Sequence, residues 1–289
     1  MKIDRLFQKL FMGGEWHVGI RKYAQAVKPT YNLVDAPNNQ WIADPFLYEY
    51  EGKHYLFVEQ YVKEEQHACL GCYEIIDDVP TNYHVIVKTP YHMSYPCVFR
   101  FDGHHYMIPE SSANNSIDLY EATEFPFRWE HKKVLLQGDK YVDSTVYVVG
   151  GKIMLLSYRK SSDGWYIVQF EVKIEEGELN KVSEKKYVSN TGRPAGFIFK
   201  ENGNLLRPSQ DCSKKYGESL IINKVEMFDE QGFEEHQISK IIYKDVNVPI
   251  RVQRIHTINR DSVYEVVDLF QEKIDLLHAF KIIKRKYKL

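Results

Sequence analysis

The sequence predicts an all-β protein and, within that class, a five-bladed β-propeller. The first observation is a recurring hairpin pattern, in which a tight turn joins two strand-like runs. The second is its spacing, because the turns are centred near residues 51, 102, 150, 202 and 260, about 50 residues apart. Further strand-like runs lie between the hairpins, so each repeat has enough strands for a four-stranded blade. A two-sheet sandwich is the competing architecture, and it explains the hairpins but not their even spacing.

Four of the hairpin segments align closely. Each turns on a residue pair that ends in glycine, and such pairs suit two-residue hairpins because both central residues need positive φ. The segments are DPFLYEYEGKHYLFVE (44–59), YPCVFRFDGHHYMIPE (95–110), DSTVYVVGGKIMLLSY (143–158) and AGFIFKENGNLLRPSQ (195–210). A fainter fifth copy, QRIHTINRDSVYEVVD (253–268), turns at Arg260-Asp261 and lacks the glycine. The five copies predict one propeller domain over residues 1–289.

The two ends of the chain are predicted to complete the propeller. EWHVGIR (15–21) precedes the first hairpin, and we expect it to supply a strand that closes the ring on the last blade. The first residues and the segment EKIDLLHAFKIIKRKYKL (272–289) carry apolar side chains at helical spacing, which predicts short amphipathic helices at both ends. The C-terminal helix ends in a basic tail, of a kind that can also lie on an anionic membrane surface.

The composition excludes several classes of protein. There are 38 Lys and Arg residues against 40 Asp and Glu residues, a net charge of −2, which argues against a dedicated nucleic-acid binder. The N-terminus lacks the apolar region of a signal peptide, and no run approaches the roughly 18 apolar residues of a membrane span. We therefore expect a cytoplasmic protein. The pair Cys69 and Cys72 is interpreted as reduced side chains on a strand, rather than as a zinc or redox site.

The open ends of the five hairpins are predicted to form a polar ring. Positions equidistant from a two-residue turn face each other across the strands, and the first strand of each propeller blade lines the axis. The pairs predicted in this way are Asp44/Glu59, Tyr95/Glu110, Asp143/Tyr158, Ala195/Gln210 and Gln253/Asp268. Because these ends converge on one mouth, the sequence predicts a sugar-binding pocket there.

Short motifs spread along nearly the whole chain point to a family. They are WHVGIR (16–21), WIADPF (41–46), SYPCVF (94–99), PES (109–111), DST (143–145), GRPAG (192–196) and HTIN (256–259). With these motifs and Glu59 at a strand end, the chain resembles bacterial relatives of the N-terminal domain of glucosamine inositolphosphorylceramide transferase. It also resembles the five-bladed glycoside hydrolases of the family 43/32 type, which cleave arabinofuranosides, xylosides and fructosides.

The resemblance to the hydrolases carries over one catalytic position. In those enzymes an Asp, often followed by Pro, opens the first blade and acts as base or nucleophile, and Asp44-Pro45 matches it. Two departures put the remaining positions in doubt. Tyr95 opens the second blade where those enzymes often have Asp, and Glu110 is followed by Ser-Ser rather than by the Gly-Pro or Cys-Pro of their general acid.

The candidate site residues follow from the ring and the resemblance. Asp44 is predicted to be a general base, and Glu110 and Asp143 are candidate proton donors. The residues predicted to bind substrate are Glu59, Tyr95, Tyr158, Arg193, Arg207, Gln210, His256, Asp268, His17 and Arg21. Basic groups near a mouth would suit a phosphorylated substrate. The alternative for each residue is structural: Asp-Pro initiates turns, and an Arg is most often part of an ordinary ion pair.

Three functions fit this sequence. The first is a glycosyltransferase of surface-polysaccharide or glycolipid assembly, which takes a sugar from a phosphorylated donor, for instance a phosphoribosyl one, to a glycan or lipid-linked acceptor. The second is a furanosidase- or xylosidase-like hydrolase with Asp44 as base and Glu110 or Asp143 as acid. The third is a non-catalytic carbohydrate-binding propeller. No cofactor is indicated, although an acidic ring could hold a divalent cation. The C-terminal helix would place the protein at the inner membrane face.

Overall fold

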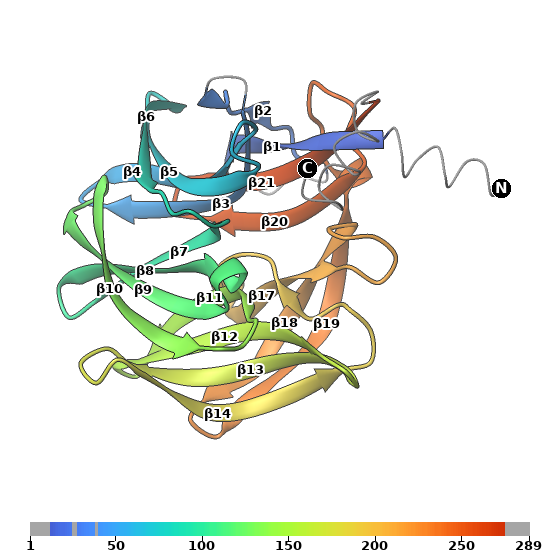
Figure 1. The fold of residues 1–289 in the computed structure, drawn as a ribbon. Coiled ribbons are helices and arrows are strands. Elements are labelled where there is room, and N and C mark those ends of the chain that lie inside the picture. The colour runs from blue at the N-terminus through green and yellow to red at the C-terminus, as the bar shows by residue number, and fades with distance from the viewer. Residues whose placement is uncertain (1–11, 25–27, 38–39, 275–289) are drawn as a thin grey trace, which may run out of the picture.

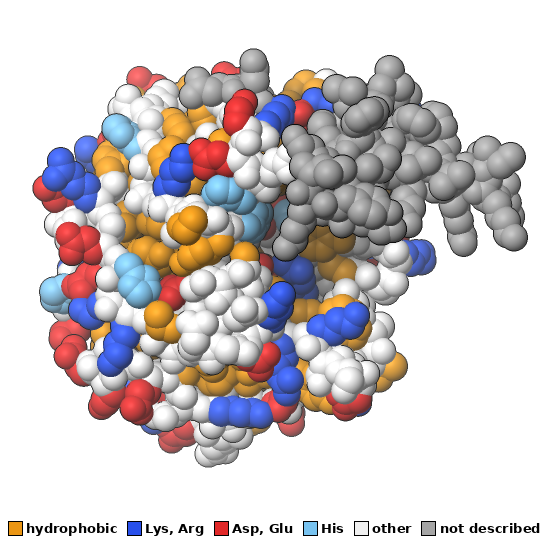
Figure 2. Space-filling model, in the orientation of Figure 1, with side chains coloured by type: hydrophobic (Ala, Val, Ile, Leu, Met, Phe, Trp, Pro, Cys, Tyr) orange, Lys and Arg blue, Asp and Glu red, His pale blue; other side chains and the backbone are white. Residues whose placement is uncertain are grey.

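The computed structural model describes residues 12–24, 28–37 and 40–274, which form five antiparallel sheets arranged as the blades of a propeller (Figure 1). The predicted five-bladed propeller is thereby confirmed. The first strands of neighbouring blades contact one another at four of the five junctions, and β20 of blade five contacts β17 and β18 of blade four, which places these strands around the axis. Acidic and basic side chains are interspersed over the face seen in Figure 2, in line with the small net charge.

The first three blades follow the chain strand by strand. Blade one consists of β3 (Trp41–Tyr50), β4 (Lys53–Val62), β5 (His67–Ile76) and β6 (Val79–Val87). Blade two consists of β7 (Ser94–Phe101), β8 (His104–Ser111), β9 (Ser116–Glu124) and β10 (Arg128–Gln137). Blade three consists of β11 (Val142–Val149), β12 (Lys152–Ser161), β13 (Gly164–Lys173) and β14 (Glu178–Tyr187).

The last two blades are less regular. In blade four two short strands share the inner position and both pair with the third: β15 (Arg193–Pro194), β16 (Phe199–Glu201), β17 (Asn204–Asp211), β18 (Ser219–Asp229) and β19 (Gly232–Ile242). Blade five joins both ends of the described chain: β20 (Arg254–Arg260), β21 (Tyr264–Ile274), β1 (Met12–Lys22) and β2 (Asn32–Leu33). Short 3-10 helices lie at Ser112–Asn114 and Tyr243–Asp245.

The ring closes as the sequence predicts. β1 lies beside β21 and pairs with it from Gly13 opposite Lys273 to Lys22 opposite Tyr264 (Figure 1). The β1 side chains alternate between faces, so Val18 and Ile20 are buried against blade one. A strand from the beginning of the chain therefore ties the last blade to the first.

The hydrophobic core fills the spaces between neighbouring blades. On β4, for example, Leu56 and Val58 pack in the cluster shared with blade five, whereas Phe57 packs in the cluster shared with blade two. Both faces of β4 are thus buried, because blade one has a neighbouring blade on either side. Cys69 and Cys72 are buried free thiols on β5, as expected.

Four of the five predicted turns have the expected position. Residues 51–52, 102–103, 150–151 and 202–203 connect directly paired strands. The fifth differs, because Arg260 pairs with Glu265 and the turn spans residues 261–264 rather than lying at Arg260-Asp261. Here the Asp261 carboxylate accepts the backbone N–H groups of Val263 and Tyr264, at 2.8 and 2.6 Å, and takes the place of the glycine.

The predicted terminal helices fall mostly outside the described residues. β21 continues to Ile274, so the predicted helix at 272–289 is wrong for its first three residues, which extend the blade-five sheet. The rest of that segment and the predicted N-terminal helix lie outside the described residues. Within the part of the chain that the structure describes, no helix has the length and hydropathy needed to cross a membrane.

Candidate active site

A β-bulge opens the inner strand of four blades at the mouth. In blade one Ala43 pairs with Glu59 and Phe46 pairs with Phe57, so two residues, Asp44 and Pro45, face one residue of β4. Blades two, three and five repeat this at 95–96, 143–144 and 256–257. The first bulged residue has φ of 45° at Asp44, 50° at Tyr95 and 50° at Asp143, a left-handed backbone that costs roughly 1–2 kcal/mol in a residue other than glycine.

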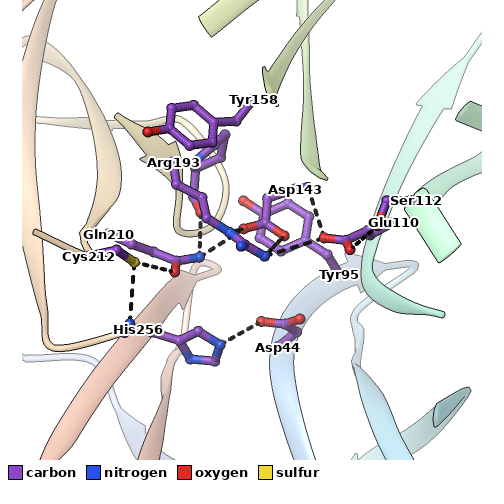
Figure 3. A network of polar contacts seen from close by, with 12 residues as sticks. Asp44, Tyr95, Glu110, Ser112, Asp143, Tyr158, Arg193, Gln210, Cys212 and His256 are labelled. Atoms are coloured by element: carbon purple, nitrogen blue, oxygen red, sulfur yellow. Dashed lines mark hydrogen bonds and ion pairs between the residues drawn. The ribbon is translucent and has the colours of Figure 1, made fainter. Parts of the chain in front are cut away.

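The bulge corrects the predicted cross-strand pairs. Because it inserts one residue, the partners of Glu59, Glu110 and Tyr158 are Ala43, Ser94 and Val142, not Asp44, Tyr95 and Asp143. In blade four Gln210 pairs with Arg193 instead of Ala195. In blade five the bulged His256 and Thr257 face Asp268, where the sequence predicted Gln253. The bulge takes Asp44 and Asp143 out of the ladder pairing, and their side chains point toward His256 and Arg193, respectively (Figure 3).

One group of side chains at the mouth is held by Arg193 (Figure 3). Its guanidinium forms a two-pronged ion pair with Asp143, in which Nη2 donates to Oδ1 at 3.1 Å and Nε to Oδ2. The same Nη2 also donates to Glu110 Oε2 at 3.4 Å. Gln210 Nε2 donates to Asp143 at 2.8 Å, and the Ser112 hydroxyl donates to Glu110 at 2.7 Å. Glu110 and Asp143, both candidate acids, therefore share one cation.

The second group surrounds Asp44. Its carboxylate is only 4% exposed, and Oδ1 lies 3.4 Å from His256 Nε2. The opposite nitrogen of that imidazole, Nδ1, lies 2.6 Å from Asp268 Oδ1. The ring of His256 stacks on Trp16 from β1, with centroids 3.9 Å apart and planes inclined by 23°. The closing strand of the ring thus contributes directly to the site.

Burial dominates the acid–base properties of the pocket. It raises the pKa of Asp44 to about 7, with further increases from Asp143 and Asp268 and opposing effects of His256 and Arg193. Burial also raises the pKa of Asp143 to about 7, against the effect of Arg193. The pKa of Glu59 lies well above its ordinary value because of burial and the charges of Asp44 and Glu110. Asp44 and Asp143 can therefore exchange protons near neutral pH, which suits acid–base chemistry.

Glu59 and Tyr216 complete the mouth. Glu59 is nearly buried, and its Oε1 lies 3.3 Å from His92 Nε2 on the segment that leads into blade two. Tyr216, on the loop between β17 and β18, lies with its ring 5.1 Å from the Arg193 guanidinium and edge-on to His256 at 5.3 Å. Tyr216 as a residue is 44% exposed, so an aromatic residue borders the carboxylates. Sequence reasoning missed Trp16, His92 and Tyr216 because they lie outside the hairpin repeat; the WHVGIR motif was the one signal for Trp16.

Several predicted site residues lie elsewhere. Arg207 is fully buried in an ion pair with Glu235 on β19. Arg21 lies at the far end of β1 and pairs with Glu265, and His17 points to the face of β1 opposite Trp16. Tyr95 and Tyr158 are also buried, with their hydroxyl groups bonded to Thr145 and Gly196 and to Asn190, respectively. The polar groups of Arg207, Arg21, Tyr95 and Tyr158 thus contact other groups of the protein, whereas His17 Nε2 is buried without a hydrogen-bond partner among the described residues. That these five side chains bind substrate stays a prediction.

The predicted cluster of cations is therefore reduced to Arg193 and His256. Asp268, also predicted to bind substrate, is fully buried behind His256. Asp44, His256 and Asp268 offer ligand atoms within 4.8 Å of one another, as a metal site would. However, the Asp268 oxygens already accept the backbone N–H groups of Asp44, His256 and Thr257 together with the imidazole N–H. A cation would have to break these bonds, so the group fits a hydrogen-bonded chain better than a metal centre.

Comparison of sequences identifies a family. The family model described as glucosamine inositolphosphorylceramide transferase 1, N-terminal, matches residues 30–263. The chain is 30% identical over 210 residues to glucosamine inositolphosphorylceramide transferase 1 of Oryza sativa subsp. indica, which covers 69% of this chain and 28% of that protein. The Arabidopsis thaliana protein of the same name is 29% identical over 228 residues, 75% of this chain and 28% of that protein. These relatives are plant proteins, and the predicted bacterial affiliation stays a prediction.

Comparison of structures confirms the fold. The α-L-arabinofuranosidase of Podospora anserina, solved with cellotriose, superposes with a TM-score of 0.58 at 12% identity, over 87% of this chain and all of that one. A family 117 glycoside hydrolase of Zobellia galactanivorans gives a TM-score of 0.53 at 10% identity, over 93% and 92% of the two chains. At such low identity the likeness is one of architecture.

Proposed function

The chain belongs to the family of the N-terminal part of glucosamine inositolphosphorylceramide transferase 1, and on that premise we propose that its propeller is a glycosyltransferase of glycolipid or surface-polysaccharide assembly. The chain spans about 28% of the length of the plant relatives, so placing a transfer activity in this part of them is itself part of the proposal. Their name supplies the substrate classes: an amino sugar as the group transferred and an inositol-phosphate glycolipid as acceptor.

The observation that carries the proposal is the placement of Asp44. It is a carboxylate on a left-handed bulge, almost buried, with Oδ1 3.4 Å from His256 Nε2. Such a group can take the proton of an acceptor hydroxyl as that oxygen attacks the anomeric carbon of the donor. The new bond joins the acceptor oxygen to that carbon, and the bond to the phosphate leaving group breaks. Attack from the side opposite the leaving group inverts the anomeric centre.

The other side of the pocket suits the leaving group. A departing phosphate needs no proton but gains from a cation, and Arg193 is the guanidinium at the mouth. Its Nη1 forms no hydrogen bond with the described residues, whereas Nε and Nη2 are held by Asp143 and Glu110. We assign this free nitrogen to a phosphate oxygen of the donor. With one guanidinium available, a compact donor of the sugar diphosphate or phosphoribosyl type remains compatible with the site.

Hydrolysis is the second candidate, and one observation favours it. Burial raises the pKa of Asp143 to about 7, so this carboxyl could donate a proton to a leaving sugar. Against this, Asp143 accepts hydrogen bonds from Arg193 and Gln210, and these stabilise the ionised form. Transfer explains both Asp44 and the Arg193 pair, so it is preferred.

The test uses the purified full chain and its Asp44→Asn variant. Each is incubated with a phosphorylated donor, UDP-N-acetylglucosamine or phosphoribosyl diphosphate, and an inositol-phosphate glycolipid, and products are identified by mass spectrometry. Transfer abolished by D44N supports the proposal. Release of sugar from aryl furanosides or xylosides supports hydrolysis, and glycan binding without turnover in either variant supports a binding module. Parallel reactions with EDTA test the expectation that no divalent cation is needed.

The proposal extends to location. The acceptor class is a lipid, and the basic residues beyond Ile274 would attach the protein to an anionic surface of the cytoplasmic face. Sedimentation with phosphatidylserine vesicles, compared with neutral vesicles, measures this. Equal recovery with both kinds of vesicle would remove the membrane from the proposal.

A further inference from the structure

Asp268 is built to hold the imidazole of His256. It is fully buried, and its Oδ1 accepts the backbone N–H of Thr257 at 2.9 Å and of His256 at 3.3 Å. Its Oδ2 accepts the backbone N–H of Asp44 at 2.9 Å. His256 Nδ1 makes the fourth contact, at 2.6 Å, with a carboxylate whose position is fixed by three hydrogen bonds from backbone N–H groups. This contact fixes the proton on Nδ1 and directs Nε2 toward Asp44.

The ring plane is fixed as well. His256 is 2% exposed and stacks on the indole of Trp16, whose face attracts a cation. Gly217 packs closely against both residues, since a Cβ at this position would lie 2.8 Å from His256 Cβ and 3.0 Å from the Trp16 ring. The imidazole is thus held by packing from three chain segments, and its nitrogens have two carboxylate neighbours.

The charges around His256 come from several elements. Asp268 on β21, Asp44 on β3 and Asp143 on β11 raise its pKa. Burial has the largest single effect and lowers the pKa of His256, yet the net direction is upward. Arg193 on β15 and the Tyr216 ring lie on the mouth side, and Glu59 on β4 lies beside Asp44.

We propose that His256 is a positioning residue, the middle member of a chain Asp268–His256–Asp44, which presents a positive charge to Asp44 and keeps it a carboxylate ready to accept a proton. The role of Asp44 as base rests on the proposed function, whereas the charge state of His256 does not. Removing the imidazole would leave the Asp44 and Asp268 carboxylates without the cation between them. Asp44 would then hold its proton to higher pH.

The chain offers a matched control in His105. This histidine is also buried and also stacked on an aromatic ring, Phe125, with centroids 4.0 Å apart and planes inclined by 21°. It forms no hydrogen bond or ion pair with a carboxylate among the described residues. Burial and the charge of Arg100 lower its pKa, against a smaller opposing effect of Glu51. The two histidines therefore separate the effect of the carboxylates from that of burial and stacking.

The test measures protonation directly. Nitrogen-15 chemical shifts of the histidine side chains are recorded against pH in the wild type and in three variants, His256→Gln, His105→Gln and Asp268→Asn. The signals that disappear in the first two variants are assigned to His256 and His105. We expect both nitrogens of His256 to be protonated at pH 7 and to titrate above the ordinary 6.5, and His105 to be neutral. D268N should lower the midpoint of His256. A neutral His256 at pH 7 would overturn the proposal, and Trp16 fluorescence, quenched by a protonated imidazole, gives a second reading if D268N does not fold.

Activity gives an independent readout. Where transfer is observed, H256Q should raise the apparent pKa of the acid limb in the pH profile of kcat/KM by one unit or more. H105Q should leave that apparent pKa unchanged. A uniform loss at all pH values, with the limb fixed, would show that His256 only supports the fold. If no donor is turned over, the proposed function fails, while the nitrogen shifts still decide the charge of His256.

Discussion

Arg193 and Asp143 are 50 residues apart in the sequence and form a two-pronged ion pair at the mouth of the propeller. The pair joins blade four to blade three, and its third member, Glu110, comes from blade two. One guanidinium from blade four therefore binds two carboxylates, one from blade three and one from blade two.

Arg193→Met should destabilise the protein by about 3 kcal/mol, because it leaves two poorly hydrated carboxylates without their cation. Urea unfolding measures this. The control is Arg159→Met, which breaks a more exposed pair with Glu184 and should cost less than about 1 kcal/mol. Equal losses in the two variants would contradict a structural role for the mouth pair.

Asp44→Asn should lower kcat/KM by a factor of about 100 or more, the usual contribution of a general base. In the wild type, activity should fall as pH drops through the pKa of Asp44, about 7, because the protonated carboxyl cannot accept a proton. A pH–rate profile checks this. A profile that is flat between pH 6 and 8 would rule out this base.

Asp44 should also make stability depend on pH. Its folded pKa is raised from 3.8 to about 7, so its stabilising contribution is complete below pH 3.8 and is lost as pH rises through 7. The free energy of unfolding of D44N relative to wild type should therefore rise with pH over that window, by at most about 1.4 kcal/mol per pH unit. Thermal or urea unfolding at several pH values measures the difference, which should be constant if Asp44 ionises normally.

Tyr216→Ala should weaken substrate binding by several-fold, because the half-exposed ring next to Arg193 offers a face for a sugar to stack on. Tyr216→Phe keeps the ring and should retain most of the affinity. Calorimetric titration with the donor that is turned over compares the variants. If Phe and Ala behave alike, the hydroxyl rather than the ring makes the contact.

Gly217→Ala should be more harmful than Gly52→Ala. Both glycines have positive φ, 61° and 72°, so both changes strain the backbone by about 1 kcal/mol. At Gly52 the new Cβ meets nothing within 4 Å, whereas at Gly217 it meets His256 and Trp16. The extra loss in unfolding free energy, with a change in Trp16 fluorescence, measures how tightly the loop packs on the site.

The sequence alone determined the number of blades, four of the five turns and the closing strand. These depend on local chemistry: glycine pairs that adopt positive φ, and strands whose apolar residues recur every 50 or so positions. It also identified Asp44, Glu110, Asp143, Arg193 and His256 as residues of one mouth, because register within a repeat fixes which end of a strand a residue occupies.

The tertiary structure decided which side chains face the pocket and what they contact. A bulge adds one residue and shifts every cross-strand pair, and nothing in the local pattern announces it. Arg207 and Arg21 carry the same charge as Arg193, yet each forms an ion pair with a buried glutamate on another strand of its own blade. Trp16 and Tyr216 come from segments outside the repeat. The pairing of β1 within blade five brings Trp16 to His256, and the packing of blade four on blade five brings Tyr216 there.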